Sequence, residues 1–557
     1  MRLFACLAAF LAVCIGCGAR APQTTSTPSL LAAATTPVAR GNTTEPIVAW
    51  HFLGTAQLAG NANAAALRET LAQPASQFLV EGALDKLARA PGLWLGLAAA
   101  TNATTWPLIR PLLADALGAE SIGTVHAGSA ESAVVIAIRA ADAQAKTLEG
   151  RWKNWIAALG AGPASEIKVG SLAVQEARAG GNAVWFRTAH ANGWSLFGAG
   201  RGAAQAFAEV AGRLGTPLTT DNWLELKADG AQWAGFFGWP DPTSWPDADL
   251  KITGKGPNLR TSARLLYPQP LDLKLEPWRL PTNTISDPLV SFTAVQGFRP
   301  WLARQPWWKQ LGFPSTPNQA AAWTVGEIPF ASYMGWEAGD VNASLRAILP
   351  NTPAWLGQNV PKIRYGDLVF QTNQSRLAWI NLPIAEPFLS PATEKDPGFI
   401  LGGLFPLVRS KQPPPAGLLS QIYGRTNLVY YHWELTHERI SGWRHVKNLY
   451  WMLAGYQPPP TNHTGEAWLS DTNVIMRLGN TATEITLTSP RELTAVRSSG
   501  SGLTGGELVM LMRWLDDPIF PFLSDPAMAP GVLRRQQAKP AAAAKPANPA
   551  PPQAPGR

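Results

Sequence analysis

Cysteine is nearly absent from this sequence of 557 residues. The three cysteines, Cys6, Cys14 and Cys17, all lie at or before position 17. The rest of the chain contains no thiol. Disulfide frameworks, thiolate metal sites and cysteine nucleophiles are therefore excluded from it.

Charge is also scarce, because only 15% of the residues are Asp, Glu, Lys or Arg, and the formal net charge is +8. Most of this excess lies at the two ends of the chain. One positive charge belongs to Arg2, and five belong to the C-terminal tail, at Arg534, Arg535, Lys539, Lys545 and Arg557. The remainder carries about +2, without a basic stripe interleaved with aromatic residues. We therefore expect no nucleic-acid partner.

Long apolar runs are missing as well. The run from Leu3 to Ile15 is about 13 residues long, shorter than the roughly 20 that a transmembrane helix needs. It follows Arg2 and has the length of a signal-peptide core. Two later runs, Gly398 to Val408 and Leu508 to Leu515, are shorter still or interrupted by Arg513, and predict buried elements.

The apolar run ends in Cys14-Ile15-Gly16-Cys17, which resembles the lipobox of bacterial lipoproteins. The resemblance implies that residues 1–16 are a signal peptide and that Cys17 is lipidated and becomes the mature N-terminus. It also implies a lipid-anchored protein of the bacterial cell envelope, at the outer membrane on its periplasmic or surface face. Cys14 departs from the family, which usually has Leu at that position. The alternative is a secreted protein that is cleaved elsewhere.

Composition divides the remaining chain into four parts. Residues 17–44 are rich in Ala, Thr, Pro and Ser and predict a disordered tether. Residues 45–285 and 286–532 predict an N-terminal and a C-terminal α+β lobe, each of mostly antiparallel sheet with packed helices. Residues 533–557 predict a disordered, basic tail rich in Pro and Ala.

Three pairs of similar segments suggest that the two lobes are an internal duplication. Glu45 to Trp50 matches Asp287 to Phe292 in character, and Ile138 to Ala145 matches Trp336 to Ala343. The third pair is a hairpin pattern at 185–197 and 369–380. We also predict helices at 61–71, 77–89, 142–159, 202–214 and 506–515, and strands at 133–138, 182–188, 193–197, 232–237, 258–266, 271–276, 473–478 and 484–488.

The densest group of metal-capable residues contains His432, Glu434 and His437, followed by Glu438 and His445. The period of two along a strand places His432 and Glu434 on one face. However, Ser441 stands where the second histidine of an H-E-x-x-H zinc motif would lie. We therefore expect hydrogen-bonded polar residues here, without a metal ion or cofactor.

Three other motifs are incomplete. The glycines of Gly198 to Gly202 have the spacing G-x-G-x-G, whereas a dinucleotide-binding loop needs G-x-G-x-x-G. Ser165 to Lys168 has the S-x-x-K spacing of penicillin-binding proteins, but it follows Gly162-Pro163 and predicts a strand. The acidic residues Asp241, Asp247 and Asp249 lack the glycine and the distal Glu of an EF-hand.

The 24 tryptophans are spread along the whole chain and not clustered, which favours core packing over sugar-stacking platforms. Together these patterns predict a membrane-anchored binding or scaffold protein that is not an enzyme. Its expected partners are the membrane, through the lipid, and an envelope protein or wall polymer. One alternative is an envelope hydrolase that acts on glycans. Another is a carbohydrate- or peptidoglycan-binding protein that uses exposed tryptophans.

Overall fold

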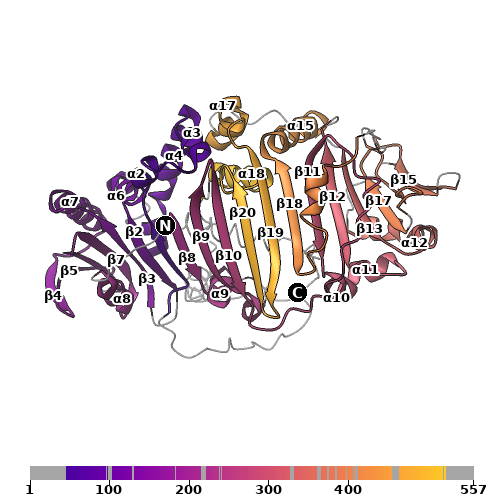
Figure 1. The fold of residues 1–557 in the computed structure, drawn as a ribbon. Helices are drawn as coiled ribbons and strands as arrows, with labels where there is room; N and C mark the ends of the chain where they lie inside the picture. Colours follow the sequence, from indigo (N-terminus) through magenta and orange to yellow (C-terminus); the bar gives the residue numbers. More distant parts are fainter. Residues whose placement is uncertain are drawn as a thin grey trace, which may run out of the picture.

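The computed structural model describes residues 45–521 except 96, 98–102, 128–130, 182, 215–220, 238, 240, 327–330, 360–365, 373–374, 383–384, 397, 406, 408–411, 455–462 and 519. Its main element is a single antiparallel sheet of 20 strands with helices packed on it (Figure 1). The protein therefore has an α+β fold, as predicted. Cys17, the signal peptide, the tether and the basic tail lie outside the described residues.

The sheet has two groups of ten strands. The first group contains β1 (Val48–Phe52), β2 (Ser121–Ala127), β3 (Glu131–Arg139), β4 (Ser165–Val169), β5 (Leu172–Ala179), β6 (Val184–Ala191), β7 (Trp194–Gly202), β8 (Leu224–Ala228), β9 (Asp247–Lys255) and β10 (Asn258–Leu266). The second contains β11 (Leu289–Gln296), β12 (Gln319–Val325), β13 (Ser332–Glu337), β14 (Asp367–Gln371), β15 (Arg376–Ile380), β16 (Phe388–Pro391), β17 (Phe399–Gly403), β18 (Leu428–Leu435), β19 (Asn480–Ser489) and β20 (Glu492–Ser499).

The two groups have the same spatial order from the edge of the sheet to its centre. The first runs β4-β5-β6-β7-β3-β2-β1-β8-β9-β10, and the second runs β14-β15-β16-β17-β13-β12-β11-β18-β19-β20. They join where β10 pairs with β20. The sheet is thus continuous across the centre of the molecule.

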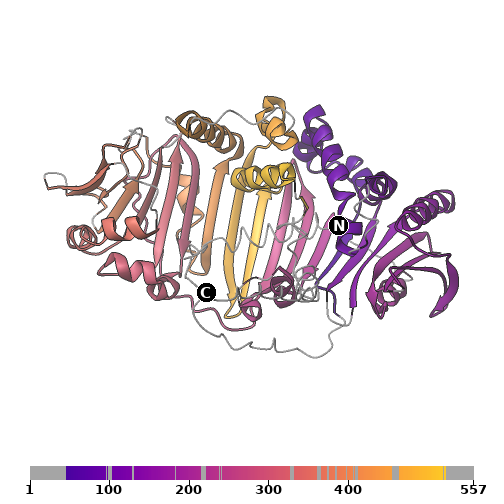
Figure 2. The same cartoon turned by 180° about the vertical axis from the view of Figure 1, so that it is seen from behind.

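Helices cover both faces of the sheet, but in different places. We call one side the α18 face, because α18 (Gly505–Asp516) lies across the central strands there (Figure 2). The largest core lies on this face and includes side chains of α4 (Pro74–Leu87), α6 (Trp106–Gly118) and α7 (Asp142–Ala158). On the opposite face, α8 (Gln205–Arg213) packs on the outer strands of the first group. On the same face, α14 (Ala416–Ser420) packs on the second group of strands.

One line of paired residues crosses the centre of the sheet on the α18 face. Residues that pair directly across neighbouring strands lie on the same face. We call this line the cross-sheet row, and it consists of Phe52, Leu224, Ile252, Thr261, Arg497, Thr483, His432 and Thr293. Its side chains are apolar from Phe52 to Ile252 and polar from Thr261 to Thr293.

Three predicted strands are wrong. Residues 232–237 belong to helix α9 (Gly230–Phe237), where the Asp229 carboxylate accepts a hydrogen bond from the Gln232 N–H at 2.8 Å. Residues 473–478 overlap helix α17 (Thr472–Ile475), which Asp471 caps in the same way. In both places an aspartate accepts a hydrogen bond from a backbone N–H of the first helical turn, which favours the start of a helix. The third, residues 271–276, is not a strand, because these residues pair with no other strand.

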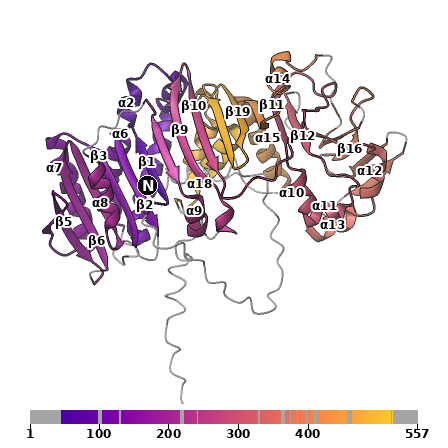
Figure 3. The same cartoon turned by 60° about the horizontal axis from the view of Figure 1, so that its bottom comes forward.

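Several other elements lie close to the predicted ranges, and the hairpin between β6 and β7 turns at Asn192-Gly193 with positive φ at both residues. Figure 3 shows the sheet from below, with its twist from one edge to the other. Within the described residues, no helix combines the length and the apolar character needed to cross a membrane.

Candidate functional site

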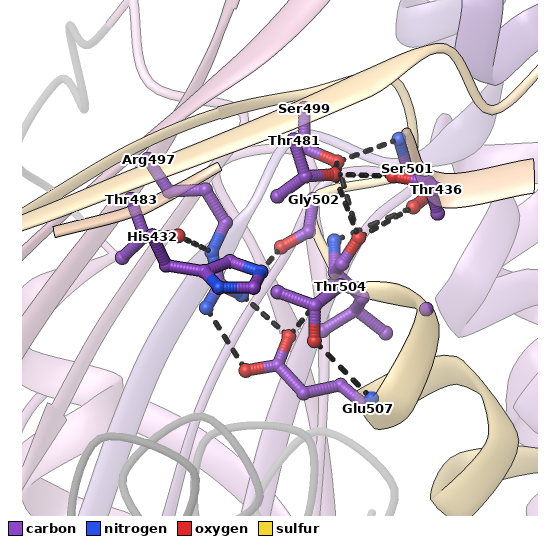
Figure 4. Close-up of polar contacts among 12 residues, drawn as sticks. His432, Thr436, Thr481, Thr483, Arg497, Ser499, Ser501, Gly502, Thr504 and Glu507 are labelled. Carbon is purple, nitrogen blue, oxygen red and sulfur yellow. Dashed lines mark hydrogen bonds and ion pairs between the residues drawn. The ribbon is translucent and has the colours of Figure 1, made fainter. Parts of the chain in front are cut away.

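The polar half of the cross-sheet row is the most elaborate group of buried polar side chains in the described residues (Figure 4). Arg497 lies in its centre and is only 6% exposed. Its Nε donates to the Thr483 hydroxyl at 2.8 Å, and its two terminal nitrogens pair with the Glu507 carboxylate at 2.7 and 2.9 Å. The guanidinium also donates to the Gly502 carbonyl at 3.1 Å. All three guanidinium nitrogens of Arg497 therefore bond protein groups.

Glu507 connects this arginine to the beginning of α18. Its carboxylate accepts a hydrogen bond from the Thr504 N–H at 2.8 Å, and its own N–H donates to the Thr504 hydroxyl at 3.2 Å. This reciprocal pair is a capping box, which satisfies backbone donors that a helix N-terminus leaves unpaired. One carboxylate thus starts the helix and ties it to β20.

Glu434 is the second buried carboxylate, on β18, and only 1% of it is exposed. Its Oε1 accepts hydrogen bonds from the Gly505 N–H at 2.6 Å and from the Thr436 hydroxyl at 3.2 Å. Its Oε2 lies 3.2 Å from Nε2 of His432, whose Nδ1 lies 2.8 Å from the Thr293 hydroxyl. The carboxylate therefore connects strand β18 to two helix beginnings.

The electrostatics of the site favour an ionised Glu434. Burial alone would raise the pKa of this carboxyl, but the bond to His432, the Gly505 N–H and the charge of Arg439 outweigh it and lower the pKa. Helix α15 (Thr436–Ala454) and α18 both start beside Glu434. The positive ends of their dipoles also favour an anion there. The protein fills this anion site with its own side chain.

Two of the three metal candidates do meet at this site, since His432 and Glu434 are in contact. The third, His437, lies on α15 with its Nε2 3.4 Å from the Glu438 carboxylate. No three His, Cys, Asp or Glu side chains of the described residues form a group that could hold a metal ion. The contacts of His432 and Glu434 are those of hydrogen-bonded structural residues.

The incomplete motifs lie in positions that do not suit their chemistry. Gly198 to Gly202 belongs to strand β7, so it provides no loop before a helix that could hold a phosphate. Ser165 to Lys168 lies in strand β4, where the lysine is not one helical turn behind the serine. Asp241 precedes a short 3-10 helix, and Asp247 accepts a hydrogen bond from the Gly230 N–H at 3.1 Å.

The sequence analysis missed a second polar cluster, formed by Ser195, His190 and Asp142. The Ser195 hydroxyl lies 3.4 Å from His190 Nδ1, and His190 Nε2 lies 3.3 Å from the Asp142 carboxylate. Ser195 and His190 line a cleft of about 100 Å³ between α7 and the outer strands. The turn between β6 and β7 brings His190 opposite Ser195, and only that hairpin pattern in the sequence could have indicated the contact.

This cluster does not have the geometry of a serine nucleophile and its base. The serine is only 2% exposed, so an acyl substrate has no access to its hydroxyl. The imidazole is also reversed relative to the Ser-His-Asp triad, in which Nε2 faces the serine and Nδ1 faces the aspartate. We interpret the cluster as hydrogen bonds that hold α7 against the hairpin.

Comparisons with known proteins give no family. No protein-family model matches the chain, and no curated protein matches it. One similar solved structure is described as "Structure of crystal form I of TP0453". It has 9% sequence identity and a TM-score of 0.22, and the alignment covers 40% of this chain and 76% of that chain. A TM-score this low does not show that the two chains share a fold.

Proposed function

We propose that this chain is a lipid-anchored, non-catalytic binding or scaffold protein of the bacterial cell envelope. The observation that supports the non-catalytic part is that the polar side chains of the cross-sheet row on β11, β18, β19 and β20 are all hydrogen-bonded to protein groups. Arg497, Glu507 and Glu434 all hold helix beginnings against the sheet. The anchoring part is supported by the lipobox-like sequence that ends at Cys17.

The glycan hydrolase alternative receives less support. Such an enzyme needs two carboxyl groups about 5 to 10 Å apart on either side of the scissile bond. Two clefts among the described residues are each lined by a single carboxylate residue, Asp247 in one and Glu149 in the other. Neither cleft therefore provides an acid together with a nucleophile or base.

The proposal includes an internal duplication of two α+β lobes at residues 45–285 and 286–532. The identical order of the two groups of ten strands supports it, since β1 to β10 lie in the first range and β11 to β20 in the second. Two of the three pairs of similar segments also fall at equivalent strands, β1 with β11 and β3 with β13. The third pair does not, because residues 369–380 lie in β14 and β15.

The anchor can be tested by substituting the predicted lipidation site. We expect Cys17→Ala to release the protein from the membrane fraction of the producing bacterium and to abolish incorporation of labelled fatty acid. Cys6→Ala is the matched control, because it removes a cysteine of the same segment outside the lipobox. Membrane retention and fatty-acid labelling of the Cys17→Ala variant would contradict the proposal.

A further inference from the structure

A small cleft lies at one end of the central strands, where the start of β9, the end of β10 and the turn between β19 and β20 meet. Its volume is about 120 Å³. Its main lining side chains are Thr243, Trp245, Asp247, Leu266, Tyr267 and Arg491. The volume is well below the roughly 300 to 1,000 Å³ of pockets that hold drug-sized ligands. The cleft therefore has room for one small substituent of a larger ligand, but not for a drug-sized molecule.

Arg491 is held in a fixed position on one side of this cleft. The Tyr267 N–H donates to the Arg491 carbonyl at 2.8 Å, and the Arg491 Nε donates to the Tyr267 carbonyl at 2.9 Å. No described residue bonds the two terminal nitrogens of this exposed guanidinium. They are therefore available as donors to an acceptor in the cleft.

The other side of the cleft provides an acceptor and an aromatic surface. The Asp247 carboxylate is oriented by the Gly230 N–H at 3.1 Å. Glycine is required at position 230, because a Cβ atom there would lie 2.0 Å from the Pro246 carbonyl oxygen. The half-buried indole of Trp245 packs against Trp239, with ring centroids 4.6 Å apart and an interplanar angle of 37°.

These groups define the ligand by its chemistry. One cation and one carboxylate face a small space with an apolar wall at Leu266, so a neutral group with one acceptor, one donor and a methyl is complementary to it. An acetamido group has these three features. Its carbonyl would accept from Arg491 and its N–H would donate to Asp247. The indole of Trp245 offers an apolar face to the adjoining sugar ring.

We infer that this cleft is a binding site for an acetamido sugar within a glycan chain. The inference deepens the proposed binding function by naming the ligand class. It would make the molecule a carbohydrate-binding protein, one of the two alternatives that the sequence left open. It does not depend on the lipid, because the cleft is built from residues 230–268 and the turn at 490–491.

The test is calorimetric titration of the full-length chain, both in its native form in detergent micelles and as the Cys17→Ala variant. The probes are chitotetraose, a tetramer of N-acetylglucosamine, and cellotetraose, the matched tetramer without acetamido groups. We expect chitotetraose to bind both forms equally and at least about tenfold more tightly than cellotetraose.

Substitutions then assign the binding to this cleft. We expect Arg491→Ala and Trp245→Ala each to weaken chitotetraose binding by about tenfold. Arg491 is exposed at a turn, so its variant keeps the test valid if Trp245→Ala disturbs the packing with Trp239. Trp443→Ala is the matched control, because this tryptophan is 41% exposed on α15, away from the cleft.

Four results would overturn the inference. They are no heat of binding with chitotetraose, equal affinity for the two tetramers, unchanged affinity of a folded Arg491→Ala variant, and an equal loss with Trp443→Ala. Failure of the anchor proposal would be seen in a different experiment, as membrane retention of the Cys17→Ala variant. The two failures are therefore distinguishable.

Discussion

The two halves of the cross-sheet row lie on the same face of one sheet but have opposite character. In the first group of strands, Phe52 and Leu224 belong to the large apolar core. In the second group, Arg497, His432 and Thr483 form a buried polar network. Both halves lie under helices, so burial alone does not decide which kind of side chain occupies the row.

At the β11 end of the row, one extra residue in the strand contributes to this difference. The pairing of β1 with β2 is continuous, whereas the pairing of β11 with β12 shifts between Leu289 and Ser291. Such a bulge reverses the face of every following side chain. Trp50 therefore lies in the core of the α18 face, while Phe292 lies in a separate core on the other face. Thr293 then occupies the α18 face and contacts His432.

The two halves of the row therefore hold their helices on the sheet by different interactions. Apolar area supplies a non-directional attraction on the Phe52 side. On the polar side, charged hydrogen bonds fix the beginnings of α15 and α18 at defined points of the sheet. We therefore expect substitutions in the two halves to differ in size, in pH dependence and in how they combine.

The largest effect is expected for Arg497→Met, which keeps the side-chain volume but leaves the buried Glu507 carboxylate unpaired. Breaking a buried ion pair in this way costs about 3 to 5 kcal/mol of unfolding free energy. Urea denaturation followed by tryptophan fluorescence measures it. Lys227→Ala, at an exposed position of β8, is the control, with an expected change below about 0.5 kcal/mol. A loss below about 1 kcal/mol for Arg497→Met would contradict the burial of a charged pair.

A slightly smaller loss, about 3 kcal/mol, is expected for Leu224→Ala in the apolar half of the row. The cost comes from lost transfer energy and from the cavity that remains, because Leu224 is 5% exposed within the large core. No titrating group is removed. The loss should therefore be the same at pH 4 and pH 7, and a strong pH dependence would show that the two halves are not distinct.

Glu434→Gln should cost about 1 to 2 kcal/mol at neutral pH, because it removes charge-assisted bonds to His432 and the Gly505 N–H. The pKa of this carboxyl is lowered in the folded protein, so its stabilisation is present above the ordinary pKa of about 4.3 and is lost as the pH falls through the folded value. The variant and the parent should therefore converge in stability at acid pH. A difference that is constant from pH 7 to pH 3 would show that the charge of Glu434 is not what stabilises the site.

The smallest effect is expected for Tyr431→Phe, next to His432 but on the opposite face. Burial, assisted by the charge of Glu484, raises the pKa of Tyr431 to about 12. Its hydroxyl donates to Gln421 at 2.6 Å, a bond worth about 1 kcal/mol. The stabilisation that the protonated Tyr431 hydroxyl gives the folded protein is present below pH 10 and is lost as the pH rises through about 12. Absorbance at 295 nm should show one fewer phenol titrating near pH 12 in the variant. A phenol that titrates near pH 10 would contradict its burial.

Much of the fold was accessible from the sequence, but the polar network was only partly so. Hydrophobic periodicity located helices such as α7 and α18 and strands such as β10, because their patterns are local. The contact of His432 with Glu434 also follows from the strand period. Arg497 and Glu507 were not singled out, since their pairing depends on where α18 docks on the sheet. The bulge in β11 has no clear local signal, although it sets the face of Phe292.

The central claim is that the buried polar network is an internal anchor for helices and not a site for a ligand or a reaction. The most direct test adds Glu507→Gln to Arg497→Met. The glutamine keeps an acceptor for the Thr504 N–H but removes the unpaired charge. We predict that the double variant recovers at least about 2 kcal/mol of unfolding free energy relative to Arg497→Met. A double variant that is less stable than Arg497→Met would contradict the account.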